Sequence, residues 1–336
     1  MIEKYYLENE AKNKTENKGE TVSILNKKNM NLITRSDFDG LVTGTLLKKA
    51  GIIDTFSFVH PKDVQDGKVT ATANDIVTNL TYIEGCGAWF DHHHTEIDRK
   101  KDLQHVEGVV AYADSAARIV YDYLGGCAFF TDAFDALMEA VDKIDAAKLE
   151  KEDILNPTGW ILLGFLTDAR TGLGRIRNFT ISNYQLMEKL LEACQVPDIE
   201  RIIALPDVQE RVVCYHEQAT LFKDMVKQNS RVEGKVLITD LREVETIYVS
   251  NRFAPYAMYP EANLSAWIVP GLKGQGCAVA VGHSIINQSS QLNVGDLMKK
   301  YEGGGHIKAG TFQLDQAKID AGLLDQALTE LVSLNR

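Results

Sequence analysis

The stretch "MNLITRSDFDG", residues 30–40, places two aspartates and a glycine directly after a short apolar run. The run "LIT" (32–34) is typical of a short buried strand, and the sequence after Gly40 is typical of a helix that a further glycine ends. Alternating side chains can direct the carboxylates of Asp37 and Asp39 into one pocket, and Gly40 permits a tight entry into the helix. A capped turn without a ligand is the alternative interpretation of this pattern.

Further apolar runs at 53–60, 75–80 and 87–91 are typical of strands, and they lie among helical patterns at 115–124 and 131–147. Near-continuous apolar strands among helices indicate an α/β fold with a largely parallel, doubly wound sheet. The chain is mostly helical from about 159 to 230, and strand patterns return after it. They predict a second, smaller α+β domain.

A chain of 336 residues is too long for one ordinary core. We expect a polar, disordered N-terminus over 1–27 and a first domain over 28–200. A helical connector over 201–230 and a second domain over 231–336 follow, with the active-site cleft between the two domains. An edge strand or the first-domain helices could support a homodimer.

The composition, 45% hydrophobic and 25% charged, is that of a soluble globular protein. No apolar run approaches the roughly 18 to 20 residues that span a bilayer. The polar start has no secretory pattern, and five scattered cysteines without C-x-x-C spacing favour reduced thiols. We therefore expect a cytoplasmic protein with no membrane partner.

The formal net charge of −11 argues against a broad basic face that would bind long duplex nucleic acid. It is compatible with a small anionic substrate, because a local metal or arginine cluster can outweigh the global field. The charge thus favours a short or small phosphorylated ligand.

A second polar stretch, "WFDHHHTE" (89–96), follows another strand pattern, and Asn79 follows the strand before it. Ligands of parallel α/β sheets bind at the carboxyl ends of the strands, where these side chains would gather. Carboxylates with imidazoles suit Mn²⁺, Mg²⁺ or Zn²⁺ in a hydrolytic centre. A structural zinc site is disfavoured, because no cysteine lies close in sequence.

Four motifs in order, "SDFDG", "FDHHHTE", "AVDKID" and "GGGHIKAG", resemble the DHH phosphoesterase superfamily with a C-terminal DHHA1 domain. The resemblance covers about residues 28–336. The superfamily includes RecJ-type exonucleases, nanoRNase/pAp phosphatases, cyclic-dinucleotide phosphodiesterases and exopolyphosphatase-like proteins. This short chain is most similar to the exopolyphosphatase-like or nanoRNase-like branch.

The resemblance implies a metal site for one or two ions, with Mn²⁺ first and Mg²⁺, Co²⁺ or Zn²⁺ as alternatives. It assigns Asp37, Asp39, His92 and Asp142 as ligands. Asp145, one helical turn after Asp142, would be a partner behind the ligands, although a solvated acidic helix face is the alternative for both.

The same resemblance implies that Asp91 supports the site and that His93 lies nearer the substrate phosphate. His94 matches no fixed position and is expected to face solvent. Metal-bound water would attack phosphorus, while His93 and Arg35 stabilise charge on the phosphoryl oxygens.

In the second domain, Gly303, Gly304, Gly305 and His306 match the glycine-rich DHHA1 segment. Backbone N–H groups there can bind an anion, and His306 can donate to a phosphoryl oxygen.

Several arginines are further candidates for binding the substrate: Arg175, near Asp168, Arg170 and Arg177, and Arg252. Ordinary surface ion pairs are the alternative for the first group.

Two positions depart from the superfamily pattern. Ile33 and Arg35 occupy the stretch where many members carry a histidine. At the end of the strand before the D-H-H strand, the usual bridging aspartate is replaced by Asn79, whose amide supplies no charge for a metal pair. With Asn79 at this position, the site would hold one metal ion instead of two, or Arg35 would bind the substrate phosphate. If the strand is shifted in register, Asp75 would take the bridging position and the usual two-metal site would form.

These features predict a divalent-metal-dependent phosphoesterase. Its substrates would be short nucleotidic phosphodiesters or phosphomonoesters, namely nanoRNA, pAp or a linear or cyclic dinucleotide. The alternatives are an exopolyphosphatase and a non-catalytic nucleotide- or polyphosphate-binding regulator with a degenerate metal site.

Overall fold

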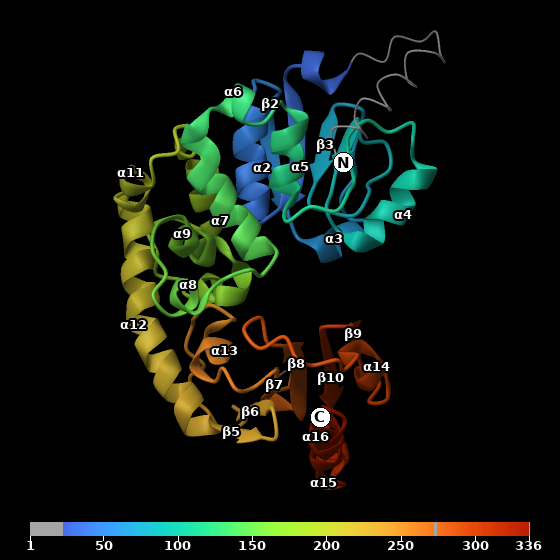
Figure 1. Cartoon of the computed structure of the whole chain (residues 1–336), viewed down its shortest axis with the longest axis vertical. Helices are drawn as coiled ribbons and strands as arrows, with labels where there is room; N and C mark the ends of the chain where they lie inside the picture. The colour runs from blue at the N-terminus through green and yellow to red at the C-terminus, as the bar shows by residue number, and fades with distance from the viewer. Residues whose placement is uncertain (1–22, 272–273, 336) are drawn as a thin grey trace.

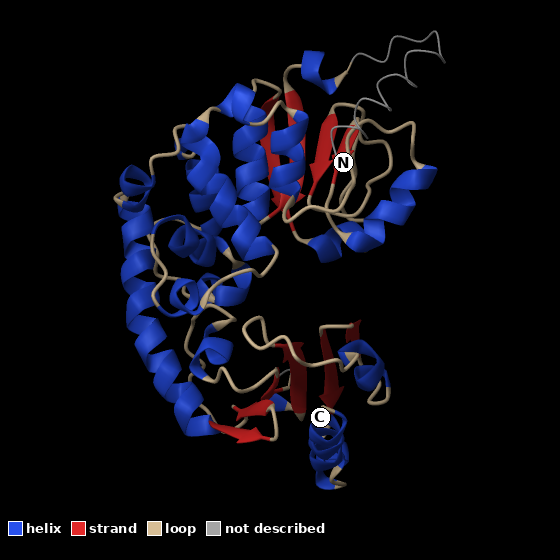
Figure 2. Ribbon diagram, in the orientation of Figure 1, coloured by secondary structure: helices blue, strands red, loops and turns tan. Residues whose placement is uncertain are grey.

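The computed structural model describes residues 23–271 and 274–335, and these residues form two separate β-sheets with helices around them. Figure 1 shows the first sheet and its helices at one end of the molecule and the second sheet at the other. Helices predominate between them (Figure 2). The predicted α/β fold with a second α+β unit is confirmed.

The predicted N-terminal segment, 1–27, lies mostly outside the described residues. Its last part is ordered, because Ile24–Asn26 form a 3₁₀ turn and Ile24 is fully buried. Glu107 accepts hydrogen bonds from the hydroxyl of Ser23 and the backbone N–H of Ile24. The end of this segment therefore forms a turn that packs on the core of the first half.

The first sheet contains β1 (Met30–Arg35), β2 (Ile53–Val59), β3 (Asp75–Thr78) and β4 (Ala88–Phe90). The strand order is β2-β1-β3-β4 and every pairing is parallel. Successive residues of a strand face opposite sides of a sheet, and in β1 and β3 successive apolar residues are buried. Both faces of the sheet are therefore covered, as a doubly wound arrangement requires.

Helix α2 (Phe38–Lys49) packs with α5 (Ala116–Tyr123) and α7 (Asp135–Asp145) on one face of the sheet. Helices α3 (Pro61–Gln65) and α4 (His94–Asp102) contribute to a smaller core on the other face. The remaining helices of the first half are α6 (Cys127–Phe130), α8 (Lys151–Leu155), α9 (Gly159–Thr167), α10 (Asn183–Ala193) and α11 (Ile199–Ile203), with 3₁₀ turns at Asp132–Phe134, Ala169–Thr171 and Leu173–Arg175.

The strand order reverses between β1 and β3. After β1 the chain forms β2 on one side of it and then returns to form β3 on the other. At such a reversal the loops that leave adjacent strands separate, so that a ligand can enter at the carboxyl ends. Arg35 ends β1, Asn79 follows β3, and Asp91 follows β4, so this edge carries the polar stretches.

Helix α12 (Pro206–Asn229) leads from the first half of the chain to the second sheet (Figure 1). Near its end, the ring of Phe222 stacks on that of Trp267 with centroids 6.0 Å apart. Phe253 and Tyr256, from the segment before β7, join the core of the first half. These contacts join the two parts of the protein.

The second sheet has the order β5-β6-β7-β8-β10-β9, with β6 and β7 parallel and the other pairings antiparallel. It has a core of its own, which includes Val236, Ile268 and Phe312. Its elements are β5 (Ser230–Glu233), β6 (Val236–Asp240), α13 (Ala254–Met258), β7 (Leu264–Pro270), β8 (Cys277–His283), α14 (Val294–Lys299), β9 (Gly304–His306), β10 (Ala309–Leu314), α15 (Gln316–Asp320) and α16 (Leu323–Leu334).

No helix among the described residues is long and apolar enough to cross a bilayer.

Candidate metal centre

The turn from β1 into α2 fixes the first carboxylate. Asp37 caps α2, and its Oδ1 accepts a hydrogen bond from the N–H of Gly40 at 3.0 Å. A Cβ at Gly40 would lie 2.0 Å from the carbonyl oxygen of Arg35, so only glycine fits this turn. The stretch that predicts a strand–turn–helix unit therefore forms one, with Asp37 buried at the sheet edge.

The second carboxylate, Asp39, lies in the first turn of α2 and is almost fully buried. Its two oxygens accept hydrogen bonds from the N–H groups of Ala116 at 2.9 Å and Ala117 at 2.7 Å, at the start of α5. Burial, followed by repulsion from Asp145 and Asp37, raises the pKa of Asp39 well above its usual value. A cation beside this carboxylate would relieve that repulsion.

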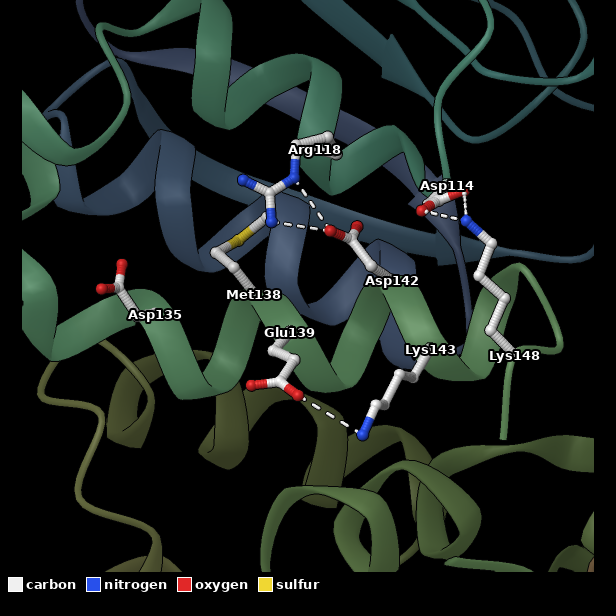
Figure 3. A pocket seen from close by; sticks show the side chains of 8 residues that line it. All are labelled: Asp114, Arg118, Asp135, Met138, Glu139, Asp142, Lys143 and Lys148. Carbon is white, nitrogen blue, oxygen red and sulfur yellow. Dashed lines mark hydrogen bonds and ion pairs between the residues drawn. The ribbon is translucent and has the colours of Figure 1, made fainter. Parts of the chain in front are cut away.

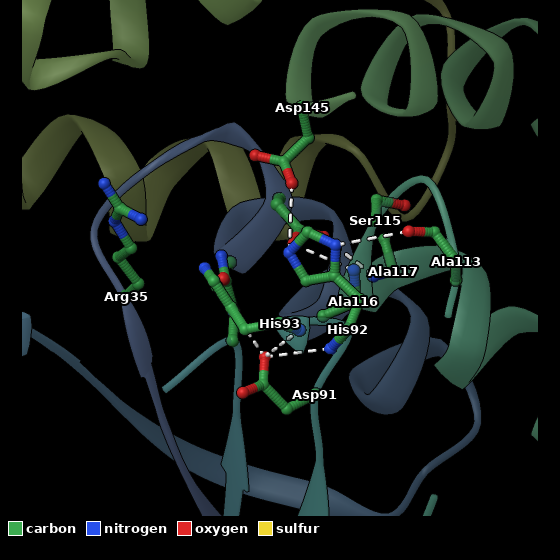
Figure 4. A network of polar contacts seen from close by, with 12 residues as sticks. Arg35, Asp91, His92, His93, Ala113, Ser115, Ala116, Ala117 and Asp145 are labelled. Carbon is green, nitrogen blue, oxygen red and sulfur yellow. Dashed lines mark hydrogen bonds and ion pairs between the residues drawn. The ribbon is translucent and has the colours of Figure 1, made fainter. Parts of the chain in front are cut away.

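The imidazole of His92 faces two carboxylates. Its Nε2 lies 3.1 Å from Oδ2 of Asp145 and 3.8 Å from Oδ2 of Asp39. The other ring nitrogen, Nδ1, is 3.4 Å from the carbonyl oxygen of Ala113, as Figure 4 shows. A proton on Nδ1 leaves Nε2 as the atom that can bind a metal. Asp39, His92 and Asp145 each offer a ligand atom within 4.8 Å of the others.

Several buried polar atoms at this edge make no well-formed hydrogen bond among the described residues: Oδ2 of Asp37, Oδ1 of Asn79, Oδ2 of Asp91 and Nε2 of His92. Two of them face a charged neighbour, since Oδ2 of Asp37 lies 2.9 Å from Arg35 Nε and Nε2 of His92 lies 3.1 Å from Asp145 Oδ2. Buried polar atoms are rarely left unpaired, because each costs about 1–3 kcal/mol. These atoms are carboxylate or amide oxygens and one imidazole nitrogen, which are common ligands of divalent cations. The residues present therefore fit a divalent metal.

Asp91 orients the two histidines that follow it. Its Oδ1 accepts hydrogen bonds from the backbone N–H of His92 at 2.9 Å and from Nδ1 of His93 at 2.7 Å. The hydrogen bond that His93 donates to Asp91 raises the pKa of His93, which favours the cationic ring. Asp91, His92 and His93 also lie close enough to hold a metal. However, the contact between Asp91 and His93 already occupies one atom of each, so the pair suits an orienting role.

The structure resolves the register of β3. Asn79 directly follows the strand, with a left-handed φ of 53°, and its Nδ2 donates to Oδ1 of Asp37 at 3.1 Å. Asp75 begins the strand at the opposite end of the sheet. There it accepts hydrogen bonds from Nδ2 of Asn31 and from the backbone N–H of Thr72. The alternative in which Asp75 reaches the metal site is therefore wrong.

Arg35 approaches the same carboxylate from the other side. Its Nε lies 2.9 Å from Oδ2 of Asp37, and 29% of its side chain is exposed. Figure 4 shows the guanidinium beside the group formed by His92, His93 and Asp145. A cation held here can compete with a metal for Asp37 or contact a bound phosphate.

Asp142 does not join the cluster, in contrast to the sequence prediction. Its Oδ1 accepts from the hydroxyl of Ser115 at 2.7 Å, and its Oδ2 accepts from Nε and Nη2 of Arg118 at 2.9 and 2.6 Å. It lines a pocket of ≈ 390 Å³ between α5 and α7 (Figure 3). Asp145, three residues later, points instead toward His92 (Figure 4). The rotation of α7 about its axis decides which aspartate faces the sheet edge, and it turns Asp145 toward that edge in place of the predicted Asp142.

The helical pattern over 115–124 predicts the start of α5, but the sequence prediction did not assign it a role in the site. Ser115 caps this helix by accepting from the N–H of Arg118, and the N–H groups of Ala116 and Ala117 hold Asp39. A serine directly before the apolar pattern is an ordinary start signal, so the position of the helix end follows from sequence. Its contact with Asp39 spans 77 residues of chain and does not.

Two arginines, Arg170 and Arg252, lie within electrostatic range of Asp145. Arg170 Nε donates to both oxygens of Asp168, at 2.8 and 3.1 Å. Arg252 lies over the ring of Phe253, and desolvation with repulsion from Arg170 lowers its pKa to about 10. Arg175 donates weakly to the carbonyl oxygens of Gly172 and Ile247.

The glycine segment forms the edge of the second sheet. Gly304, Gly305 and His306 are the exposed residues of β9, which pairs with β10 on one side. A Cβ at Gly303 would lie 2.2 Å from the carbonyl oxygen of Thr311, so the close approach to β10 requires glycine there. Figure 1 shows β9 on the side of the second sheet that is turned toward the first.

Comparisons with known proteins give a clear structural match. The chain is similar to the pGpG-specific phosphodiesterase PggH from Vibrio cholerae, with 44% identity and a TM-score of 0.83, over 91% of this chain and 100% of the other. It is also similar to the DHH domain of a protein described as a member of the s1p family of ribosomal proteins. That match has 14% identity and a TM-score of 0.54 over 93% and 88% of the chains, and it shows the fold alone. No family model and no curated protein matches.

Proposed function

Because the chain belongs to the DHH phosphoesterase superfamily, we propose that it hydrolyses linear 5′-phosphorylated dinucleotides of the pGpG type. The chain is a metal-dependent phosphoesterase. The observation that carries the choice of substrate is the 44% identity to a pGpG-specific phosphodiesterase along that protein's whole length.

We propose that Asp39, His92 and Asp145 hold the metal, with Asp37 and the carbonyl oxygen of Asn79 beside it. The support is the convergence of Asp39, His92 and Asp145 and the lack of a hydrogen bond at Nε2 of His92, Oδ2 of Asp37 and Oδ1 of Asn79. Mn²⁺ is our first choice and Mg²⁺ the second, because mixed carboxylate and imidazole ligands suit them. A bound divalent ion would lower the pKa of a water molecule and polarise the phosphoryl group.

The protein's own side chains then act on the substrate. His93, held by Asp91 and favoured in its cationic form, donates a hydrogen bond from Nε2 to a phosphoryl oxygen. Arg35 contacts the same phosphate with the part of its guanidinium that is exposed. Arg170 and Arg252 supply further positive charge for the terminal phosphate.

We also propose that the substrate lies between a first domain, 28–200, and a second domain, 231–336, joined by 201–230. The unpaired edge of β9 then offers backbone N–H groups and His306 to the end of the substrate away from the scissile bond. A two-residue substrate is short enough to touch both parts at once. Longer strands would need basic surface that a net charge of −11 does not favour.

The test is turnover of pGpG, pAp, a ten-residue RNA and polyphosphate by the full chain with Mn²⁺. We expect pGpG to give the highest kcat/KM. Preferred hydrolysis of polyphosphate would contradict the proposal in favour of an exopolyphosphatase. Tight binding without turnover of any of the four would favour the regulator. Asp39→Asn serves as the control for a contaminating hydrolase, because it should lower the rate at least about 100-fold.

A further inference from the structure

An aromatic side chain lies exposed beside the metal centre. Tyr112 is 70% exposed, more than any other large apolar or aromatic residue for which the structure shows high exposure. Exposed tyrosines are ordinary on a mobile surface loop, but this one is held in place by its neighbours. Neither the metal site nor the phosphate contacts described above use it.

The backbone on both sides of Tyr112 is hydrogen-bonded to the D-H-H stretch. The N–H of Ala111 donates to the carbonyl oxygen of Asp91 at 3.1 Å. On the other side, the carbonyl oxygen of Ala113 lies 3.4 Å from Nδ1 of His92. Tyr112 therefore occupies a fixed position one residue from a group that orients the metal ligand, while its ring projects into solvent.

One side of this ring is supported by a histidine. The rings of His94 and Tyr112 meet edge to face, with centroids 5.2 Å apart and planes at 72°. His94 begins α4 and directly follows His93, so the support comes from the stretch that also contacts the phosphate. An edge-to-face neighbour restrains a ring and leaves its exposed face available for stacking.

We propose that Tyr112, backed by His94, is the stacking surface for one nucleobase of the dinucleotide and makes the enzyme depend on a base beside the scissile phosphate. This inference rests on the proposed function, since it names how the same site selects its substrate. Stacking of bases on aromatic rings tolerates different bases, so Tyr112 favours nucleotides over polyphosphate without distinguishing guanine by hydrogen bonds. His94, expected from sequence only to face solvent, thereby becomes a positioning residue.

The experiment compares Tyr112→Ala and Tyr112→Phe with wild type on pGpG and on two analogues that each lack one base. For Tyr112→Ala we expect KM for pGpG to rise by about 10-fold or more with little change in kcat, whereas Tyr112→Phe stays within about 2-fold. The wild-type enzyme should bind one abasic analogue less well, and Tyr112→Ala should bind that analogue and pGpG equally. The matched control is Phe129→Ala, which removes a 51% exposed ring on α6, where it packs against Phe130, and should leave KM unchanged.

An unchanged KM in Tyr112→Ala, or an equal loss of affinity for pGpG and both abasic analogues, would overturn the inference.

A second readout needs no turnover: in Tyr112→Trp, GMP should quench the tryptophan emission more than inorganic phosphate does. If wild type fails to hydrolyse pGpG while GMP still quenches, the proposed function fails and the stacking surface stands. If pGpG is hydrolysed and neither readout changes, the stacking surface fails alone.

Discussion

Nδ2 of Asn79 donates a hydrogen bond to Oδ1 of Asp37 across 3.1 Å, at the edge where β1 and β3 end. This leaves the carbonyl oxygen of Asn79 buried and unpaired, close to the metal ligands. The amide thus holds Asp37 in place without a metal and without a second negative charge. A carboxylate at position 79 would instead need a cation between the two residues.

Asn79→Asp tests this relationship. Two carboxylates would then face each other in a buried site, so we expect the midpoint of thermal unfolding of the metal-free protein to fall by about 5 °C. Mn²⁺ should restore it and should bind with a higher stoichiometry than in wild type, measured by calorimetry. Aspartate tolerates the left-handed backbone at this position, so strain does not confuse the result. Unchanged stability without metal would contradict the contact.

Substitutions at Asp145 and Asp142 distinguish a metal ligand from a carboxylate that only lies near the site. Loss of a partner behind a metal ligand costs 10–100-fold, so loss of a direct ligand should cost at least about 100-fold. We expect Asp145→Asn to lower both the affinity for Mn²⁺ and kcat by that amount. Asp142→Asn is the matched control on the same helix and should keep kcat once metal is saturating. The reverse order of effects would reinstate the sequence prediction.

Arg118 acts on the site through the start of α5. Arg118 pairs with Asp142, and Asp142 also accepts a hydrogen bond from Ser115. The N–H groups of Ala116 and Ala117, which follow Ser115, bind Asp39. We expect Arg118→Gln to weaken Mn²⁺ binding about 10-fold, while kcat at saturating metal stays close to that of wild type. Lys148→Gln, which removes another ion pair from the same pocket, should leave the affinity for Mn²⁺ unchanged. If both substitutions weakened Mn²⁺ binding equally, the cause would be the loss of a positive charge from the pocket and not the position of α5.

The fold could be predicted from sequence because its signals are local. The apolar runs that became β1, β2, β3 and β4 are short and continuous, and burial on both faces of the sheet explains that continuity. The turn at Ile24–Asn26 was missed, because Ile24 packs into the core of the first half and its backbone N–H donates to Glu107, which is distant in sequence.

The candidate site could be predicted only where strand ends define it. Asp37, Asp39 and His92 follow strands, and the structure brings them to one edge. The choice between Asp142 and Asp145 depends on the rotation of α7 about its axis, which a helical pattern of mixed acids does not fix. Tyr112 lies in an irregular segment whose position depends on hydrogen bonds to Asp91, so no periodic signal marks it.

Arg35 competes with a metal for Asp37, because its Nε lies 2.9 Å from Oδ2. Removing it should therefore leave the affinity for Mn²⁺ equal or higher, the opposite of the effect of removing a ligand. We expect Arg35→Gln to raise KM for pGpG by about 10-fold, because a charge-assisted contact to phosphate is lost. Arg99→Gln is the control, since Arg99 pairs with Glu96 on α4 and should alter neither quantity. A fall in Mn²⁺ affinity with unchanged KM would show that Arg35 only positions Asp37.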